Sequence, residues 1–122
     1  GRYLYDPAES EWVSLVEELR PEPEEPSYVC LLFPGDSYLE VWRHPEGMWV
    51  GIRLWHDPKS GAFTAWEASS SPRSESGPGY RGHPFPEEHL LSLGDALAVG
   101  MAFFRDPRKA PEVKGVWWHA KA

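Results

Sequence analysis

The sequence predicts a single α+β domain, an antiparallel β-meander sheet with a helix from the C-terminal half packed on one face and a short N-terminal helix. Three observations predict this class. A chain of 122 residues suits one hydrophobic core. Strand-like alternation fills its middle, and helix-like spacing of apolar residues lies on either side. We therefore treat residues 1–122 as one domain.

Residues 10–19 are predicted to form the short N-terminal helix. Trp12 is followed by apolar residues three, four and seven positions later, which is typical of one helix face. Ser10 is a favourable N-cap residue, and Pro21 cannot continue the helix. The Pro-Glu segment 21–26 has no apolar periodicity, so we expect an extended, solvated connector there.

The middle of the chain alternates as strands do. Turn signals rich in Pro, Gly and Asp separate the alternating runs, and strands joined by such short turns pair antiparallel. The expected strands are 28–33, 38–43, 48–56 and 62–67. The following segment, 69–79, is rich in Ser, Pro and Gly and is long for a loop in a compact domain, which indicates a mobile or functional loop.

The last third is predicted to add a helix and a closing strand. Ser92 to Asp95 resembles a capping box, and Asp106-Pro107 ends the helical pattern. Residues 113–119 are predicted to form a strand of the same sheet. The expected buried face of the helix consists of Leu93, Ala96, Leu97, Gly100, Met101 and Phe104.

Composition narrows the classes of function. The formal net charge is −7 with a pI near 5.2, which argues against a protein that clamps nucleic-acid phosphates and favours a basic partner. Cys30 is the single cysteine, so no internal disulfide or cysteine-based zinc site can form, and we expect it to pack as a small apolar side chain. No basic segment followed by an apolar stretch opens the sequence and no run reaches the length of a membrane span, so we expect a cytoplasmic protein without membrane contact.

Alternation along the strands predicts an aromatic second face of the sheet. Met48, Val50, Ile52 and Leu54 form a core face, and the intervening residues of that strand point the other way. If the second face is open, it has the composition of a protein-binding surface; the alternative is that the N-terminal helix covers it through Trp12 and Leu15. The candidate partner-binding residues are Tyr38, Glu40, Trp42, Trp49, Arg53, Trp55, Trp66 and Glu67.

Other classes of function find less support in the sequence. The five histidines show no His-Glu-x-x-His or similar spacing, and no phosphate loop or nucleophile elbow is present, so we expect no catalytic residue, metal or cofactor. Stacked aromatic residues can bind nucleic acid, but the acidic charge opposes this. A small-ligand or carbohydrate-binding module that uses a tryptophan-rich sheet face is the alternative function.

The order of features in the last third resembles a known family. These features are Gly79-Tyr80 with Gly82, Phe85-Pro86, the helix from Leu93 to Phe104, Pro111, and Val116-Trp117. In this order they resemble the small immunity proteins of bacterial polymorphic toxin systems, in the family associated with nucleic-acid deaminase toxins. Segment 105–111 departs from the family, which tends to have a glycine-containing helix exit where this chain has Asp-Pro-Arg-Lys-Ala-Pro.

The resemblance implies an α+β antitoxin that has no catalytic activity. Such a protein binds a cognate toxin domain made by the same cell and occludes its active site. The resemblance carries over no toxin-contact residue, so the candidate residues above rest on strand alternation alone. With a net charge of −7, the surface is expected to mimic part of the negative charge of the toxin's nucleic acid.

Overall fold

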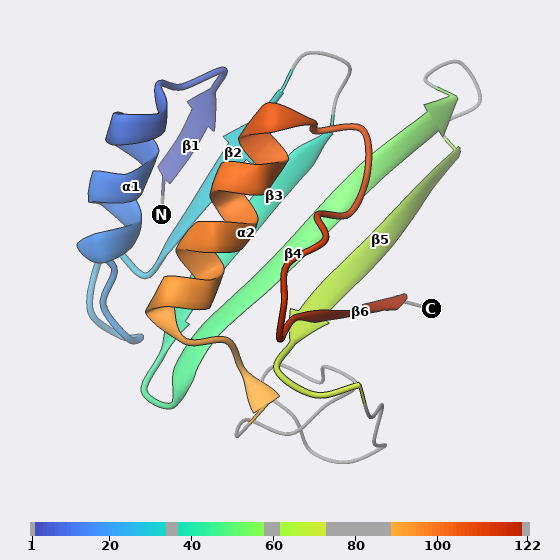
Figure 1. The fold of residues 1–122 in the computed structure, drawn as a ribbon. Coiled ribbons are helices and arrows are strands. Elements are labelled where there is room, and N and C mark those ends of the chain that lie inside the picture. Colours follow the sequence, from blue (N-terminus) through green and yellow to red (C-terminus); the bar gives the residue numbers. More distant parts are fainter. Residues whose placement is uncertain (1, 34–36, 58–61, 73–88, 121–122) are drawn as a thin grey trace.

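The computed structural model describes residues 2–33, 37–57, 62–72 and 89–120. Within these ranges the chain forms one sheet with helices packed on it (Figure 1). The strands are β1 (Arg2–Tyr5), β2 (Tyr28–Leu32), β3 (Tyr38–His44), β4 (Gly47–Asp57), β5 (Ala62–Ser69) and β6 (Trp117–Ala120). The helices are α1 (Glu9–Glu17) and α2 (Leu93–Arg105).

The strands lie side by side in the order of the sequence, β1-β2-β3-β4-β5-β6. Each neighbouring pair from β2 to β6 is antiparallel, which confirms the α+β class and the four consecutive strands predicted for the middle of the chain. The sheet is not a pure meander, because α2 separates β5 from β6 in the sequence and β1 pairs with β2 in parallel.

β1 was not predicted from the sequence. It runs parallel to β2 with α1 as the connection, and parallel neighbours require a crossover of this kind. Tyr3 and Tyr5 alternate with Leu4, but four residues are too few to distinguish a strand from an irregular segment. The loop prediction for segment 73–79 and the motif Gly79 to Pro86 lie outside the described residues.

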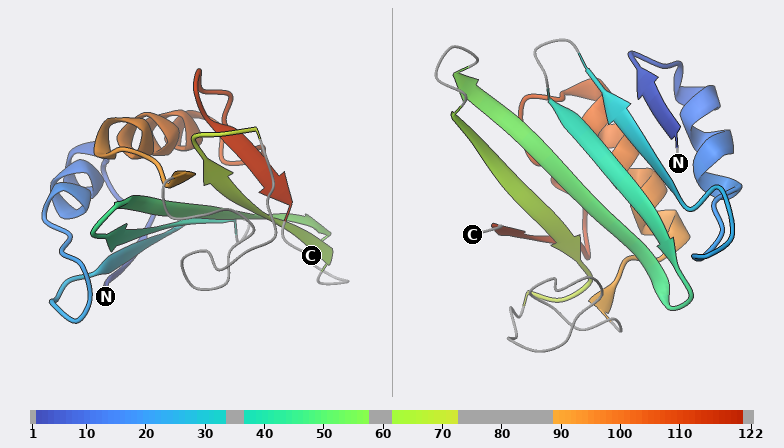
Figure 2. Two further views of the ribbon diagram at one scale, coloured as in Figure 1. Left: turned by 90° about the horizontal axis from the view of Figure 1, so that it is seen from below. Right: turned by 180° about the vertical axis from the view of Figure 1, so that it is seen from behind.

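Both helices pack on the same face of the sheet, as the left view of Figure 2 shows. The core between them and the sheet contains Trp12 and Val16 of α1, Val99 and Phe103 of α2, and buried aliphatic residues of β2 to β4. The alternative in which α1 covers the second face is therefore wrong, because Trp12 is buried at 0% exposure in this core. The second face is the face of the sheet opposite α1 and α2.

For α2, the predicted start agrees with the structure better than the predicted buried face does. Ser92 caps α2 as predicted, since its Oγ accepts a hydrogen bond from the Asp95 N–H at 3.1 Å. The expected buried face of α2 is partly wrong: Leu93 is 38% exposed, and the fully buried positions are Ala96, Val99, Gly100 and Phe103. The buried face is shifted toward Val99 and Phe103, while Ala96 and Gly100 belong to both the predicted and the observed face, and the Trp12 ring packs on Gly100.

α1 begins at Glu9, with Ala8 rather than Ser10 at the N-cap and no side-chain cap. The connector is exposed at residues 22–25 as predicted, but the prediction of an extended chain is wrong. It turns back on itself, because the Glu24 N–H donates to the Pro21 carbonyl at 3.0 Å and the Arg20 N–H donates to the Pro26 carbonyl at 2.8 Å. β6 begins at Trp117, four residues later than predicted.

Residues 89–91 extend the sheet beyond the end of β5. Leu91 and Met48 exchange backbone hydrogen bonds of 3.0 and 2.7 Å, which places Leu91 beside β4. Leu91 enters the main core, whereas Leu90 packs against Trp49 in a separate cluster. The chain just before α2 thus supports the second face as well as the core.

Candidate functional site

The strand register determines which candidate residues share the second face. Tyr38 lies opposite Arg53, Glu40 opposite Gly51, and Trp42 opposite Trp49, so these β3 and β4 residues point to one side as predicted. Glu67 of β5 joins them, because it lies opposite Gly51. Trp55 occupies a second-face position of β4 by register, and its side chain lies outside the described part of the structure.

The predicted placement of Trp66 on this face is wrong. Trp66 lies opposite Ile52 and packs, partly buried, against the main core on the helix side. Successive side chains of a strand alternate between faces, so Trp66 and Glu67 cannot both lie on the second face. The second-face residues of β5 are instead Phe63, Ala65 and Glu67.

The inner part of the second face, over β4 and β5, is buried rather than exposed. Trp49 is 7% exposed and Glu67 is 1% exposed, which contradicts the expected open patch at these two positions. The Trp49 ring lies over Gly51, where an added Cβ would be 2.7 Å from Cη2. A small cavity of about 60 Å³ remains here, lined by Tyr38, Glu40, Trp49, Gly51, Ile52, Arg53, Ala65, Trp66 and Glu67.

Arg53 lies between aromatic rings of the two neighbouring strands. Its Cζ is 4.9 Å from the ring centroid of Tyr38 on β3 and 4.3 Å from that of Phe63 on β5. Both distances are within the range of cation–π attraction. Burial raises the pKa of Tyr38, and the positive charge of Arg53 partly opposes that rise. On the second face, aromatic rings of two strands thus contact the guanidinium group of the protein's own Arg53.

The outer part of the second face, over β1 to β3, carries a row of rings that we call the aromatic row: Tyr3, which is exposed, and Tyr28 and Trp42, which are half-buried. Tyr28 and Trp42 are stacked with ring centroids 4.0 Å apart, and Tyr3 meets Tyr28 edge to face at 5.9 Å. Tyr3 is 67% exposed. Sequence reasoning identified Trp42 but missed the two tyrosines: Tyr3 because β1 was not recognised, and Tyr28 because alternation was not applied to the predicted strand 28–33.

One carboxylate, that of Glu40, contacts the aromatic row. The Trp42 Nε1–H donates a hydrogen bond to Glu40. The hydrogen bond from Tyr28 to the Tyr3 hydroxyl raises the pKa of Tyr28, as do desolvation and the negative charges of Glu40 and Glu25. Residues 1–50 contain eleven acidic and three basic side chains, and most of the acidic ones lie in the connector and on α1, which is on the other face of the sheet.

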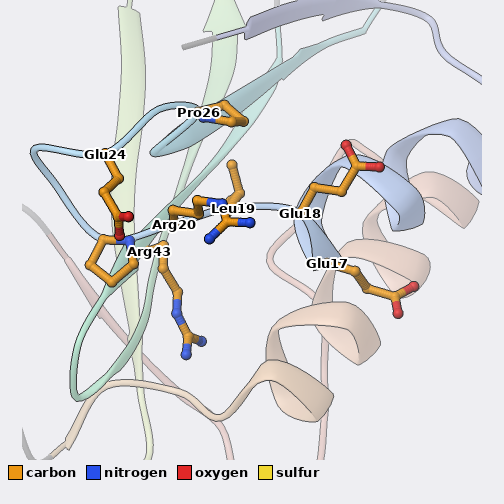
Figure 3. A pocket seen from close by; sticks show the side chains of 8 residues that line it. Glu17, Glu18, Leu19, Arg20, Glu24, Pro26 and Arg43 are labelled. Atoms are coloured by element: carbon orange, nitrogen blue, oxygen red, sulfur yellow. The ribbon is translucent and has the colours of Figure 1, made fainter.

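A second recess lies beside the connector (Figure 3). This hollow of about 620 Å³ is lined by Glu17, Glu18, Leu19, Arg20, Pro21, Glu24, Pro26 and Arg43. In Figure 3 Glu24 lies on one side, Glu17 and Glu18 project from the end of α1 on the other, and Arg20 lies between them. Acidic residues at a helix C-terminus oppose the helix dipole, so their position does not serve the stability of α1.

A serine and a histidine meet where β6 pairs with β5. His119 Nε2 is 2.7 Å from Ser69 Oγ, which in turn donates to the Ser71 carbonyl at 2.6 Å. His119 Nε2 also lies 3.2 Å from the Ser71 carbonyl oxygen, so the ring, the hydroxyl and the carbonyl form one polar cluster. This arrangement fastens β6 to the end of β5. Among the described residues no group of three metal-ligating side chains is found.

Cys30 is 5% exposed on the second face, as expected for a thiol packed as an apolar group. Burial, and secondarily Glu40, raises its pKa to about 12. The thiolate is therefore scarce near neutral pH, and we expect Cys30 to react with a disulfide reagent such as Ellman's reagent far more slowly than a free cysteine does. Rapid labelling of the folded protein, at the rate measured after unfolding in urea, would contradict this.

The described residues form an α+β domain with helices on one face of the sheet and the aromatic row on the other. Comparison with protein-family models, with curated proteins and with solved structures finds no match to this chain. Of the helices described, none is both long and apolar enough to cross a membrane.

Proposed function

We propose that this chain is an immunity protein that binds and neutralises a cognate bacterial toxin domain, of the type that deaminates nucleic acid, by occluding its active site. The observation that carries the proposal is the aromatic row with its Glu40 contact, in a chain whose formal net charge is −7. The resemblance to immunity proteins of polymorphic toxin systems supports it through α2, Pro111 and Val116-Trp117, which lie within the described residues.

A binding role fits the physical character of this surface. Tyrosine and tryptophan are enriched at the centres of protein interfaces because they bury a large area at low cost in side-chain entropy. Tyr28 and Trp42 are held by stacking on each other, and therefore lose little freedom when a partner binds. The partner in this proposal is a basic protein domain in the cytoplasm, and the chain contacts neither nucleic acid nor a membrane directly.

A flat sugar platform is a less favoured use of the same rings. A carbohydrate-binding face presents coplanar rings to the sugar. Here Tyr28 and Trp42 stack face to face at an interplanar angle of 25°, so each ring uses one face against the other. Tyr3 adds a ring turned by 83° from Tyr28. The small-ligand alternative therefore ranks below the protein-binding function.

The negative charge is expected to accelerate association with a cationic toxin. Glu18 and Glu24 are exposed, and replacing both with lysine should slow association about ten-fold. The dissociation rate should change much less. Glu67 is unsuited to this test because it is buried. Lysine at the exposed Glu112, in the more basic second half of the chain, is the control and should have a smaller effect.

The dependence of the association rate on salt concentration is a second measurement on the same variants. The Debye length falls from about 10 Å at 0.1 M to about 3 Å at 1 M, so the wild-type association rate should fall across this range. The double variant should show a weaker dependence. An association rate that is independent of salt would contradict charge mimicry, while leaving open a complex held by the aromatic row.

Neutralisation is the direct test of the function. A deaminase toxin domain encoded beside this chain's gene is assayed on single-stranded nucleic acid with and without an equimolar amount of the purified chain. We expect loss of deamination and recovery of a stable complex by gel filtration. Full activity of the toxin in the presence of excess folded chain would refute the proposal for that toxin class.

A further inference from the structure

We propose that the recess beside the connector binds a small molecule with one carboxylate and two cationic groups, the charge pattern of a basic amino acid. The recess lies on the helix side of the sheet, because Arg43 on its wall pairs with Met48, which is fully buried in the core beneath the helices. It is therefore separate from the aromatic row, and the inference goes beyond the proposed toxin binding. Either can fail without the other.

The recess has the size of a small-molecule site. Its volume of about 620 Å³ falls within the roughly 300–1,000 Å³ that is typical of ligand pockets. Its walls come from the end of α1, the connector and the end of β3 (Figure 3). Leu19, Pro21 and Pro26 supply the apolar part of these walls, against which the methylene groups of a ligand can pack.

Backbone hydrogen bonds hold the two arginines of the recess at one junction. The Arg20 N–H donates to the Pro26 carbonyl at 2.8 Å, and the Arg43 N–H donates to the next carbonyl, that of Ser27, at 2.9 Å. Ser27 is 2% exposed, so this junction is buried. The two arginines come from different segments, yet their backbones are fixed beside each other and their side chains line the same recess.

The two guanidinium groups retain donors for a ligand. In the described part of the chain neither Arg20 nor Arg43 forms an ion pair, although three glutamates line the same recess. Arg43 Nη1 lies 3.2 Å from Met48 Sδ, and a thioether sulfur is a weak acceptor. A guanidinium group has five N–H donors in a planar fork that matches a carboxylate. The pair therefore favours a carboxylate as one group of the ligand.

The glutamates of the recess select against a polyanion. Glu17, Glu18 and Glu24 face two arginines, so two positive and three negative side chains give the recess a net charge of −1. In Figure 3, Glu24 lies on one side of Arg20, and Glu17 and Glu18 lie on the other. These carboxylates repel phosphate and attract cationic groups. A ligand with one carboxylate and two cations, of net charge +1, matches this pattern.

The position of Glu17 and Glu18 supports a role in binding. Both lie at the C-terminal end of α1, whose last turn contains no basic residue. The partial negative charge of a helix C-terminus is unfavourable for carboxylates and favourable for a cation. A cationic group of the ligand at this end would complement the two carboxylates and the helix dipole together. We therefore expect bound ligand to stabilise α1.

Lysine and 1,5-diaminopentane are matched probes for this site. At neutral pH they carry the same two ammonium groups and differ only in the carboxylate of lysine. Each is titrated into the isotope-labelled protein and followed by NMR. We expect the backbone amides of Arg20 and Glu24 to shift, and lysine to bind about three- to ten-fold more tightly. Attraction by the glutamates alone gives the reverse order, since 1,5-diaminopentane has the larger net positive charge.

Arg20→Gln tests the contact with the carboxylate. Arg20 is exposed and its backbone hydrogen bond to Pro26 is kept, so the variant should fold and lose most of the preference for lysine. Arg105→Gln is the matched control, because Arg105 is an exposed arginine at the end of α2 and does not line the recess. It should leave the preference unchanged. Thermal unfolding of both variants establishes that they are folded.

Three results would overturn the inference. The first is that 1,5-diaminopentane binds as tightly as lysine, and the second is that the preference for lysine survives Arg20→Gln. The third is the absence of shifts at the amides of Arg20 and Glu24 with lysine at roughly 50 mM, far above a millimolar dissociation constant. None of these results bears on neutralisation of a toxin, since the aromatic row lies on the opposite face of the sheet.

Discussion

Replacing Gly100 with alanine is expected to lower the free energy of unfolding by about 2 kcal/mol, although alanine is the better helix former. A Cβ at this position of α2 would lie 1.8 Å from Cη2 of Trp12 and 2.3 Å from Cζ2. Trp12 is fully buried and meets Phe104 edge to face at 5.8 Å, so its ring has no free space to enter. The helices must separate or the ring must leave the core. Urea unfolding followed by tryptophan fluorescence measures the loss.

Gly94 provides the matched control in the same helix. An added Cβ there meets only Ser92 Oγ, at 4.0 Å, so Gly94→Ala should be neutral or stabilising by up to about 1 kcal/mol. A second variant tests the mechanism, because Trp12→Leu makes room for the methyl group. Gly100→Ala should then cost at least about 1 kcal/mol less than it does beside Trp12. Equal costs in both backgrounds would show that the contact is not responsible.

Much of the fold could be predicted because the strands and helices carry local signals. The turn residues between the strands fix their number, and Ser92 marks the start of α2 through a hydrogen bond within one helical turn. β1 and the shift of the buried face of α2 could not be predicted. Both depend on contacts between segments distant in sequence, namely β1 with β2 and α2 with the core residues of α1 and the sheet.

The candidate site was harder to predict than the fold. Alternation placed Tyr38, Glu40 and Trp42 on the second face, but the assignment of both Trp66 and Glu67 to it ignored that neighbours in a strand point to opposite sides. Alternation assigns a side chain to a face but does not predict how deeply that side chain is buried. Trp49 is buried because its ring folds over Gly51 and because Leu90, far along the chain, packs against it. Whether these residues contact a partner stays a prediction.

The largest effect on toxin binding is expected from Trp42→Ala, which should weaken the complex by about 30-fold or more. Trp42 joins the exposed and buried parts of the second face, since it stacks on Tyr28, packs against Trp49 and holds Glu40. Its removal takes away both a ring and the group that orients a carboxylate. The increase should lie mainly in the dissociation rate, because the charge of the surface is unchanged.

Because Trp42 also contributes to folding, the measurement needs variants that separate the two roles. Trp42→Phe keeps an aromatic ring beside Tyr28 but loses the donor to Glu40, so its affinity should fall between wild type and Trp42→Ala. Trp117→Ala removes a tryptophan of 40% exposure from the opposite edge and should leave the affinity within about two-fold. Surface plasmon resonance gives both rate constants, and thermal unfolding of each variant establishes that it is folded. If folded Trp42→Ala binds as tightly as wild type, the second face of β1 to β3 is not the toxin-binding surface.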